Sequence, residues 1–143
     1  MSRSIYAICF LLLCSLPVGA ARQYSSFAPN LITPENGAVL DNGCTNKTER
    51  EKEGTSWKFE WEGVPKAKRY HLYVIGQTAK YPAIDELEIK ATSFLRQGRG
   101  SYIADQNCKG WRWKVRAMVG GKWREWSPER TFDVEPMNTD CPR

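Results

Sequence analysis

Residues 56–62 read SWKFEWE, and this stretch decides the fold because polar and aromatic side chains alternate through it without interruption. Successive side chains of a β-strand point to opposite faces, so Trp57, Phe59 and Trp61 share one face and the polar residues share the other. The stretch therefore predicts a strand whose aromatic face is buried and whose polar face meets solvent.

The same period of two recurs along the rest of the chain. Strong alternation covers residues 69–76, 110–119 and 130–136, and weaker alternation covers 81–90 and 91–96. Pro and Gly turns separate these stretches, and no window beyond the N-terminal segment shows convincing helical periodicity. We therefore predict an all-β, antiparallel, immunoglobulin-like β-sandwich of about seven strands.

The N-terminal segment 1–21 has the layout of a secretory signal peptide. Arg3 precedes an apolar run from Ile5 to Leu13, and small residues occupy positions 19–21. The run is shorter than the roughly 20 residues that a spanning helix needs, which disfavours a membrane anchor. We therefore expect a secreted, extracellular protein without a membrane span. The expected organisation is a signal peptide over 1–21, an N-terminal tail over 22–27, one domain over 28–136 and a C-terminal tail over 137–143.

Composition and charge argue against several classes of function. The chain has 21 Lys and Arg against 16 Asp and Glu, and charges of both signs are interspersed, which favours a solvated surface over a polyanion-binding or membrane-binding patch. His71 is the only histidine, no Cys-x-x-Cys spacing occurs, and no base accompanies a nucleophile. We expect no enzymatic activity, no metal, no cofactor and no nucleic acid partner. His71 is expected to be an ordinary surface residue, and residues 85–88, DELE, are expected to form a solvated edge strand.

Five segments carry a resemblance to a known family. In chain order they are PENG at 34–37, FEW at 59–61, AKRYHLYV at 67–74, WRWKVRA at 111–117 and FDV at 132–134. Together they resemble a fibronectin type III module that covers about residues 28–136. The resemblance implies a core built by Trp61, Tyr70, Leu72 and Val74. Trp111 departs from the family pattern, in which this strand opens with a tyrosine whose hydroxyl ties a corner of the sandwich.

The stretch WREWS at 123–127 resembles the Trp-Ser-any-Trp-Ser box of type I cytokine receptors, with Arg124 in place of the first serine. The resemblance implies that Trp123 and Trp126 interleave with Lys114 and Arg116 of the preceding strand. A cation over an indole face gains roughly 0.5–1 kcal/mol when exposed, so such an arrangement would stabilise the sheet. It serves either as a structural device or as a direct ligand contact. The spacing also resembles a C-mannosylation signal at Trp123.

Two classes of binding function remain open. The first is recognition of an extracellular protein through the outer face of one sheet, because aromatic, Arg and Met side chains are enriched at interfaces. The alternative is a carbohydrate or sulfated-polysaccharide module, in which Trp123 and Trp126 stack on sugars while basic residues meet sulfates. The residues expected on the outer face are Tyr73, Ile75, Arg112, Lys114, Arg116 and Met118.

Three cysteines follow the leader, namely Cys44, Cys108 and Cys141. In an oxidising compartment we expect one pair to bond and one thiol to be left over. The fibronectin-like strand order implies that all three lie at one end of the sandwich. We predict the bond Cys44–Cys108, because Cys141 lies on a tail that would lose more chain entropy on docking. Cys141 would then be free or link two molecules in a dimer. The sequon NKT makes Asn46 a predicted N-glycosylation site.

Overall fold

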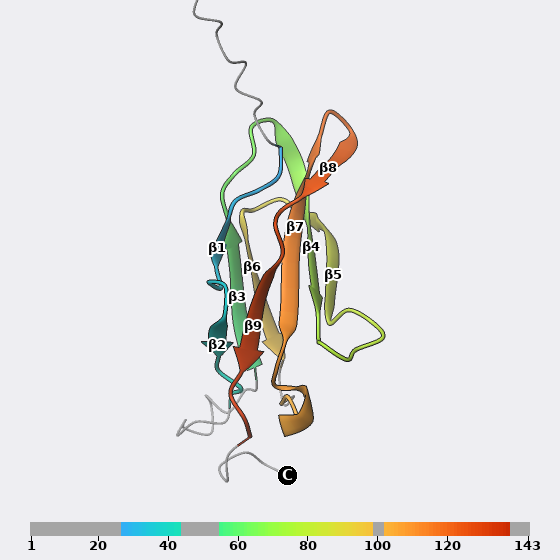
Figure 1. Cartoon of the computed structure of the whole chain (residues 1–143). Coiled ribbons are helices and arrows are strands. Elements are labelled where there is room, and N and C mark those ends of the chain that lie inside the picture. The colour runs from blue at the N-terminus through green and yellow to red at the C-terminus, as the bar shows by residue number, and fades with distance from the viewer. Residues whose placement is uncertain (1–26, 44–54, 99–101, 138–143) are drawn as a thin grey trace, which may run out of the picture.

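The computed structural model describes residues 27–43, 55–98 and 102–137, which form nine strands and one short 3₁₀ turn (Figure 1). Within these ranges no helix is long and apolar enough to cross a membrane. The predicted signal peptide lies outside them. The strands are β1 (Leu31–Thr33), β2 (Ala38–Leu40), β3 (Thr55–Trp61), β4 (Ala67–Ile75), β5 (Ile84–Ile89), β6 (Ser93–Gly98), β7 (Trp111–Val119), β8 (Lys122–Trp126) and β9 (Arg130–Val134), and the 3₁₀ turn is η1 (Asp105–Asn107).

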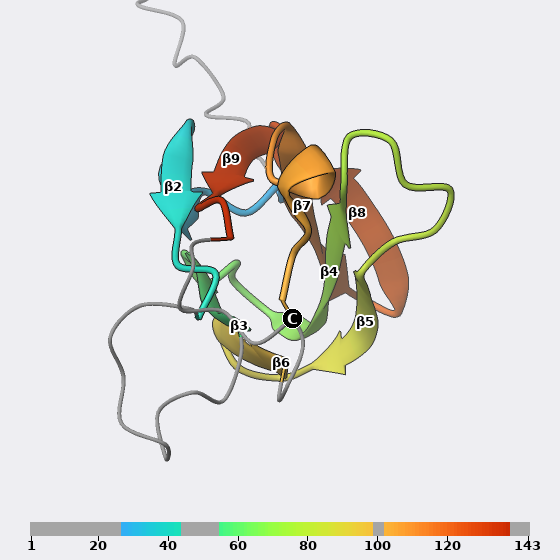
Figure 2. The same ribbon diagram turned by 90° about the horizontal axis from the view of Figure 1, so that it is seen from below.

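The strands form two sheets that enclose the core, as the view along the strands shows (Figure 2). The smaller sheet has the order β1-β3-β6, and the larger has the order β2-β9-β7-β4-β5, with β8 also paired to β7. β1 and β2 are two parts of one interrupted strand, and so are β8 and β9. The prediction of an immunoglobulin-like sandwich of about seven strands is therefore confirmed, and the strand order is fibronectin type III-like. β5, which contains residues 85–88, forms one edge of the larger sheet, as expected.

One strand pair departs from the antiparallel prediction. β2 pairs with β9 in parallel register, with Ala38 opposite Phe132. The cause is a change of sheet, because the chain leaves β1 at Thr33, passes through residues 34–37 and joins the edge of the larger sheet while running in the same direction (Figure 1). The backbone N–H of Gly37 donates to the carbonyl of Thr131 at 2.8 Å and fastens this crossing to β9.

The core confirms the alternation that the sequence predicts. Trp57, Phe59 and Trp61 of β3 are at most 1% exposed, and they face the inner side of the larger sheet. The rings of Phe59 and Trp113 meet edge-on, with centroids 5.2 Å apart. Buried residues of the larger sheet include Tyr70, Leu72, Val74, Trp113, Val115, Ala117, Phe132 and Val134. The inward side chains of β4 and β7 pack in the core, and their outward side chains form the outer surface of the larger sheet.

Trp111 takes the place of the corner tyrosine of fibronectin type III modules, to which the sequence has a resemblance. Its indole Nε1–H donates to the backbone carbonyl of Asn107 at 2.7 Å, four residues upstream. The ring also stacks on Phe132, with centroids 5.9 Å apart and an interplanar angle of 22°. The indole N–H therefore supplies a hydrogen bond in place of the missing phenol hydroxyl, and it links the start of β7 to the backbone of η1.

Candidate functional site

A two-residue turn lays β8 directly along the outer side of the larger sheet. Gly120 and Gly121 join β7 to β8 and have φ values of 62° and 74°. Positive φ at both central residues is the requirement of a type I′ hairpin, which glycine meets without steric cost. The resulting register places Trp126 opposite Arg116 and Trp123 opposite Met118.

Cations and indole rings alternate across this face. The Cζ of Arg116 lies 5.0 Å from the ring centroid of Trp123 and 4.4 Å from that of Trp126. Lys114 Nζ lies 5.1 Å from the Trp126 ring, and Arg69 Cζ lies 5.7 Å from the Trp123 ring. The row Arg69, Trp123, Arg116, Trp126, Lys114 is called the ladder below. The contacts of Arg116 and Lys114 are those that the sequence resemblance implied, whereas Arg69 of β4 was not foreseen.

His71 lies buried beneath the ladder, at 6% exposure, so its interpretation as an ordinary surface residue is wrong. Its ring centroid is 4.8 Å from that of Trp126, which covers it together with Trp123. His71 Nδ1 accepts a hydrogen bond from Arg116 Nε at 3.1 Å, and Nε2 lies 2.6 Å from Asp85 Oδ1. Because an arginine only donates, Nδ1 is the acceptor, and Nε2–H is the donor to Asp85. The imidazole therefore connects β5, β4 and β7 under the two rings.

Carboxylates flank the outer cations of the ladder. Glu88 Oε2 lies 2.6 Å from Arg69 Nη1, and Glu129 Oε2 lies 3.8 Å from Lys114 Nζ. Glu129 also reaches Arg112, with 3.6 Å between Oε1 and Nη1. These pairs are partly exposed, so solvent screens them and each contributes little to stability. Their effect is to offset the positive charge of the face.

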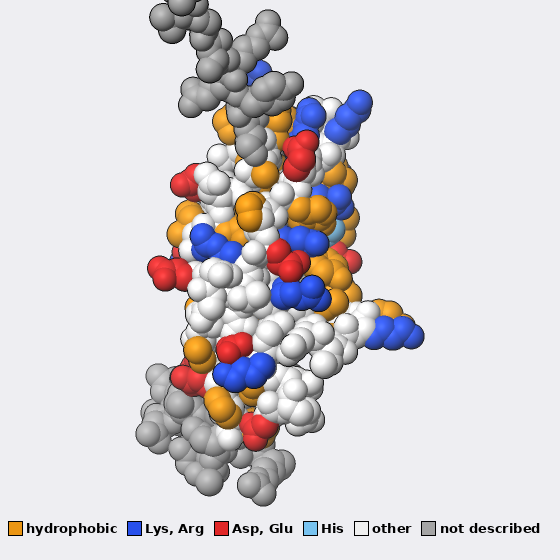
Figure 3. All heavy atoms as spheres, viewed as in Figure 1, with side chains coloured by type: hydrophobic (Ala, Val, Ile, Leu, Met, Phe, Trp, Pro, Cys, Tyr) orange, Lys and Arg blue, Asp and Glu red, His pale blue; other side chains and the backbone are white. Residues whose placement is uncertain are grey.

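The six residues predicted for a binding surface lie on this one face, the outer side of β4 and β7. Tyr73, Ile75, Lys114, Arg116 and Met118 are half-buried, and Arg112 is exposed. Tyr73 extends the ladder by one ring, because its centroid lies 5.6 Å from Lys114 Nζ. Figure 3 shows basic and hydrophobic side chains gathered over the region of β7 and β8. The face is thus a mixed aromatic, aliphatic and cationic surface.

We expect Trp126→Ala to lower the free energy of unfolding by roughly 1–3 kcal/mol, because it removes one ring contact each from Arg116 and Lys114 and uncovers His71. Urea unfolding followed by circular dichroism measures the shift. Tyr81→Ala is the matched control, since Tyr81 is 71% exposed and lies outside the ladder. A midpoint that stays unmoved in Trp126→Ala would show that the ladder does not stabilise the sheet.

The predicted disulfide and glycan fall mostly outside the described residues. Cys44, Asn46 and Cys141 lie there, so the bond between Cys44 and Cys108 stays a prediction. Cys108 is described as a buried free thiol, and its Sγ lies 3.4 Å from the carbonyl oxygen of Glu135. Burial, followed by the negative charge of Asp105, raises the pKa of the Cys108 thiol, which favours the protonated form as a donor to this carbonyl.

No family model matches the chain, and no curated protein matches it. Among solved structures, the chain is similar to the crystal structure of a Fn3-like protein from Clostridium thermocellum, with 14% sequence identity and a TM-score of 0.46. This similarity covers 80% of the present chain and 98% of the other.

Proposed function

We propose that the protein is a secreted, extracellular binding module without enzymatic activity, and that it recognises a partner protein through the outer face of β4, β7 and β8. The ladder is the observation that carries this proposal, because it holds two indole rings and an arginine half-buried on an open sheet face. Trp, Tyr and Arg are the side chains that most often dominate the binding energy of protein interfaces. Fibronectin type III sandwiches are also common among cell-surface domains.

The same contacts prepare the face for binding. Ordering a flexible side chain at an interface costs about 0.5–1.5 kcal/mol, so side chains that are already ordered bind with a smaller entropic loss. Arg116 is held by two rings and by His71 Nδ1. Arg69 is held by Trp123 and Glu88. A partner would therefore meet a surface whose long side chains have their conformations set before contact.

The geometry favours a protein partner over a sulfated polysaccharide. Each ladder indole already has two cations over it, so a sugar would have to displace a cation in order to stack there. Glu88 and Glu129 also offset the charge that sulfate groups would need. Carbohydrate binding through Trp123 and Trp126 remains the alternative. Retention on a heparin column well above physiological salt would favour it, because non-specific charge attraction is screened there.

The double variant Tyr73→Ala/Arg112→Ala tests the proposal, since both side chains lie on the outer face and neither is a core residue. We expect it to lose the partner that the mature domain captures, after chemical cross-linking, from the extracellular fluid of its host. Lys58→Ala/Leu95→Ala is the matched control, because these exposed residues oppose each other on the outer side of the smaller sheet. Equal capture by the two double variants would overturn the outer face as the binding surface.

A further inference from the structure

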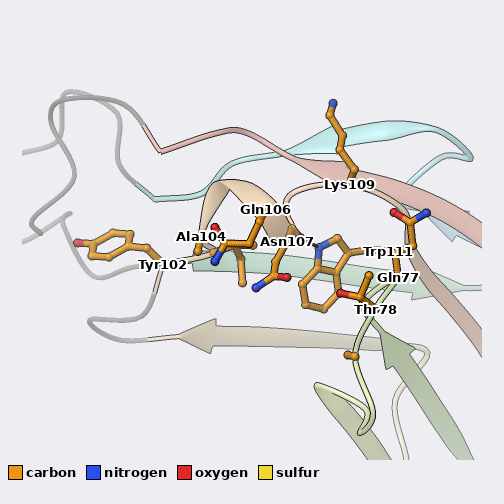
Figure 4. A pocket seen from close by; sticks show the side chains of 11 residues that line it. Gln77, Thr78, Tyr102, Ala104, Gln106, Asn107, Lys109 and Trp111 are labelled. Atoms are coloured by element: carbon orange, nitrogen blue, oxygen red, sulfur yellow. Dashed lines mark hydrogen bonds between the residues drawn. The ribbon is translucent and has the colours of Figure 1, made fainter.

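A second concave site lies at the opposite end of the sandwich from the turn between β7 and β8. The loop that follows β4, residues 76–79, and the turn η1 line a partly open cavity of about 380 Å³, with Trp111 between them (Figure 4). Small-molecule sites in proteins start at about 300 Å³, so this cavity is large enough for one small ligand. None of its lining residues belongs to the ladder or to the predicted outer face.

The loop wall lies close to Trp111. Gly76 lies against the six-membered ring of this tryptophan, because a Cβ added to the glycine would stand 3.6 Å from both Cζ2 and Cη2. The amide of Ala79 donates to the carbonyl of Gly76 at 3.2 Å and closes the loop. The ring itself is fixed by its hydrogen bond to Asn107. Both walls of the cavity are therefore tied to one buried indole before any ligand arrives.

Gly110 is a second glycine that shapes the cavity. Its φ is +67°, and an added Cβ would stand 2.8 Å from Gln77 Oε1 and 2.9 Å from Gln77 Cδ. The absence of a side chain at this position thus leaves the space in which the Gln77 amide lies. A larger residue would be strained in this left-handed conformation and would push Gln77 aside.

The walls carry uncharged polar groups that face one cavity. Gln77 and Thr78 come from the loop, and Gln106 and Asn107 come from η1, on either side of Trp111 in Figure 4. Within the described ranges, no hydrogen bond joins any of these four side chains to another residue. The charged lining group is Lys109, and its ammonium lies 2.9 Å from Asp133 Oδ2. The cavity thus offers amide and hydroxyl groups, with its positive charge already compensated.

We propose that this cavity binds a neutral sugar unit. A sugar presents vicinal hydroxyls, which both donate and accept like the amides of Gln77, Gln106 and Asn107, together with C–H groups that suit the edge of Trp111 and the methyl of Ala79. An apolar ligand would displace water from these solvent-exposed amides without replacing its hydrogen bonds, which disfavours such a ligand. An anionic or cationic ligand would find no uncompensated charge among the lining side chains.

Nuclear magnetic resonance of the ¹⁵N-labelled mature protein tests the proposal. The probes are methyl glycosides of glucose, galactose, mannose and N-acetylglucosamine, with glucuronate, glucosamine and cyclohexanol as charged and apolar comparisons. We expect saturable shifts of the Gln77, Gln106 and Asn107 side-chain amides with at least one neutral glycoside. Immobilised glycans that end in the same sugar show whether a chain terminus binds better than the free glycoside.

Two variants and one control decide the outcome. Gln77→Ala/Gln106→Ala should weaken the binding of the glycoside by about tenfold or more, since it removes hydrogen-bonding groups from both walls. Gly110→Ala should weaken it as well, while an otherwise preserved amide spectrum shows that the fold is intact. Lys80→Ala/Tyr81→Ala changes the same loop outside the cavity and should bind normally. The proposal would be overturned if none of the neutral glycosides shifted these signals. It would also be overturned if cyclohexanol or the charged sugars shifted them equally.

Discussion

Trp61→Ala is expected to lower the free energy of unfolding by about 3–5 kcal/mol. Trp61 is 1% exposed, and its ring meets that of Tyr70 edge-on, with centroids 5.5 Å apart. The two rings belong to opposite sheets, so alanine at this position leaves a cavity in the layer that joins them. Urea unfolding measures the loss, and an unchanged m-value would show that the difference lies in stability and not in the unfolded state.

Trp61→Phe separates packing from the polar atom of the indole. Phenylalanine retains most of the ring and removes Nε1, a buried N–H for which the described residues provide no acceptor. We expect a loss smaller than that of Trp61→Ala, because the phenyl ring refills most of the space and leaves only that of the pyrrole part of the indole empty. If Trp61→Ala cost no more than Trp126→Ala, Trp61 would not be the central core residue that its burial indicates.

The core was predictable because its signal is local. Each inward side chain of β3 is followed by an outward one, and Trp57, Phe59 and Trp61 could be assigned to one face from seven residues alone. The pairing of β8 with β7 was also accessible, since two glycines between alternating stretches indicate a tight hairpin. The parallel pairing of β2 was not accessible, because a change of sheet depends on how β1 and β9 meet and not on any period in residues 38–40.

His71 shows what alternation cannot predict. Its position in β4 correctly indicates the outer face, but its burial comes from Trp123 and Trp126, which lie across it from a different strand. Whether an outward residue is exposed therefore depends on the size of side chains on neighbouring strands. A signal did exist in the sequence, because two tryptophans on the strand that pairs with β7 are large enough to reach across β7 to β4.

The cavity beside Trp111 was missed for a related reason. Its polar groups come from residues 77–78 and 106–107, which lie in a loop and a 3₁₀ turn about thirty residues apart, and loops carry no periodic signal. Gly110 was the one accessible hint, since a glycine directly before a strand suggests a special backbone conformation. Its relation to Gln77 appears only when β4 and β7 lie side by side.

Asn42 and Cys108 share two backbone carbonyls at the end of the sandwich where the predicted bond to Cys44 would form. Asn42 is 1% exposed, and its amide donates to the carbonyls of Ile103 at 2.9 Å and Glu135 at 3.0 Å. Cys108 Sγ lies 3.8 Å and 3.4 Å from the same two oxygens. Cys44 follows Asn42 by two residues, which span at most about 7 Å of chain. The buried asparagine thus lies beside the Cys108 sulfur and contacts the same two carbonyl oxygens.

Loss of the predicted Cys44–Cys108 bond is expected to lower the free energy of unfolding by about 4 kcal/mol, because such a bond would close a loop of about 65 residues and restrict the unfolded chain. Cys44→Ala and Cys108→Ala should show similar losses in urea under oxidising conditions, and the double variant should cost little more than either one, since both changes remove the same bond. Wild-type protein treated with a reductant should approach the stability of the variants.

Cys141→Ala provides the matched control and tests the third thiol. We expect it to keep the stability of the wild type, because Cys141 follows β9 on a polar tail and is not part of the predicted bond. It should also abolish any disulfide-linked dimer that a reductant dissociates, since Cys141 is the thiol that we expect to be available for a bond to a second molecule. Peptide mapping without reduction identifies the linked cysteines directly. An intrachain cross-link that contains Cys141, to either partner, would contradict the assignment, and the tail would then be fastened to the end of the sandwich where Asn42 and Cys108 lie.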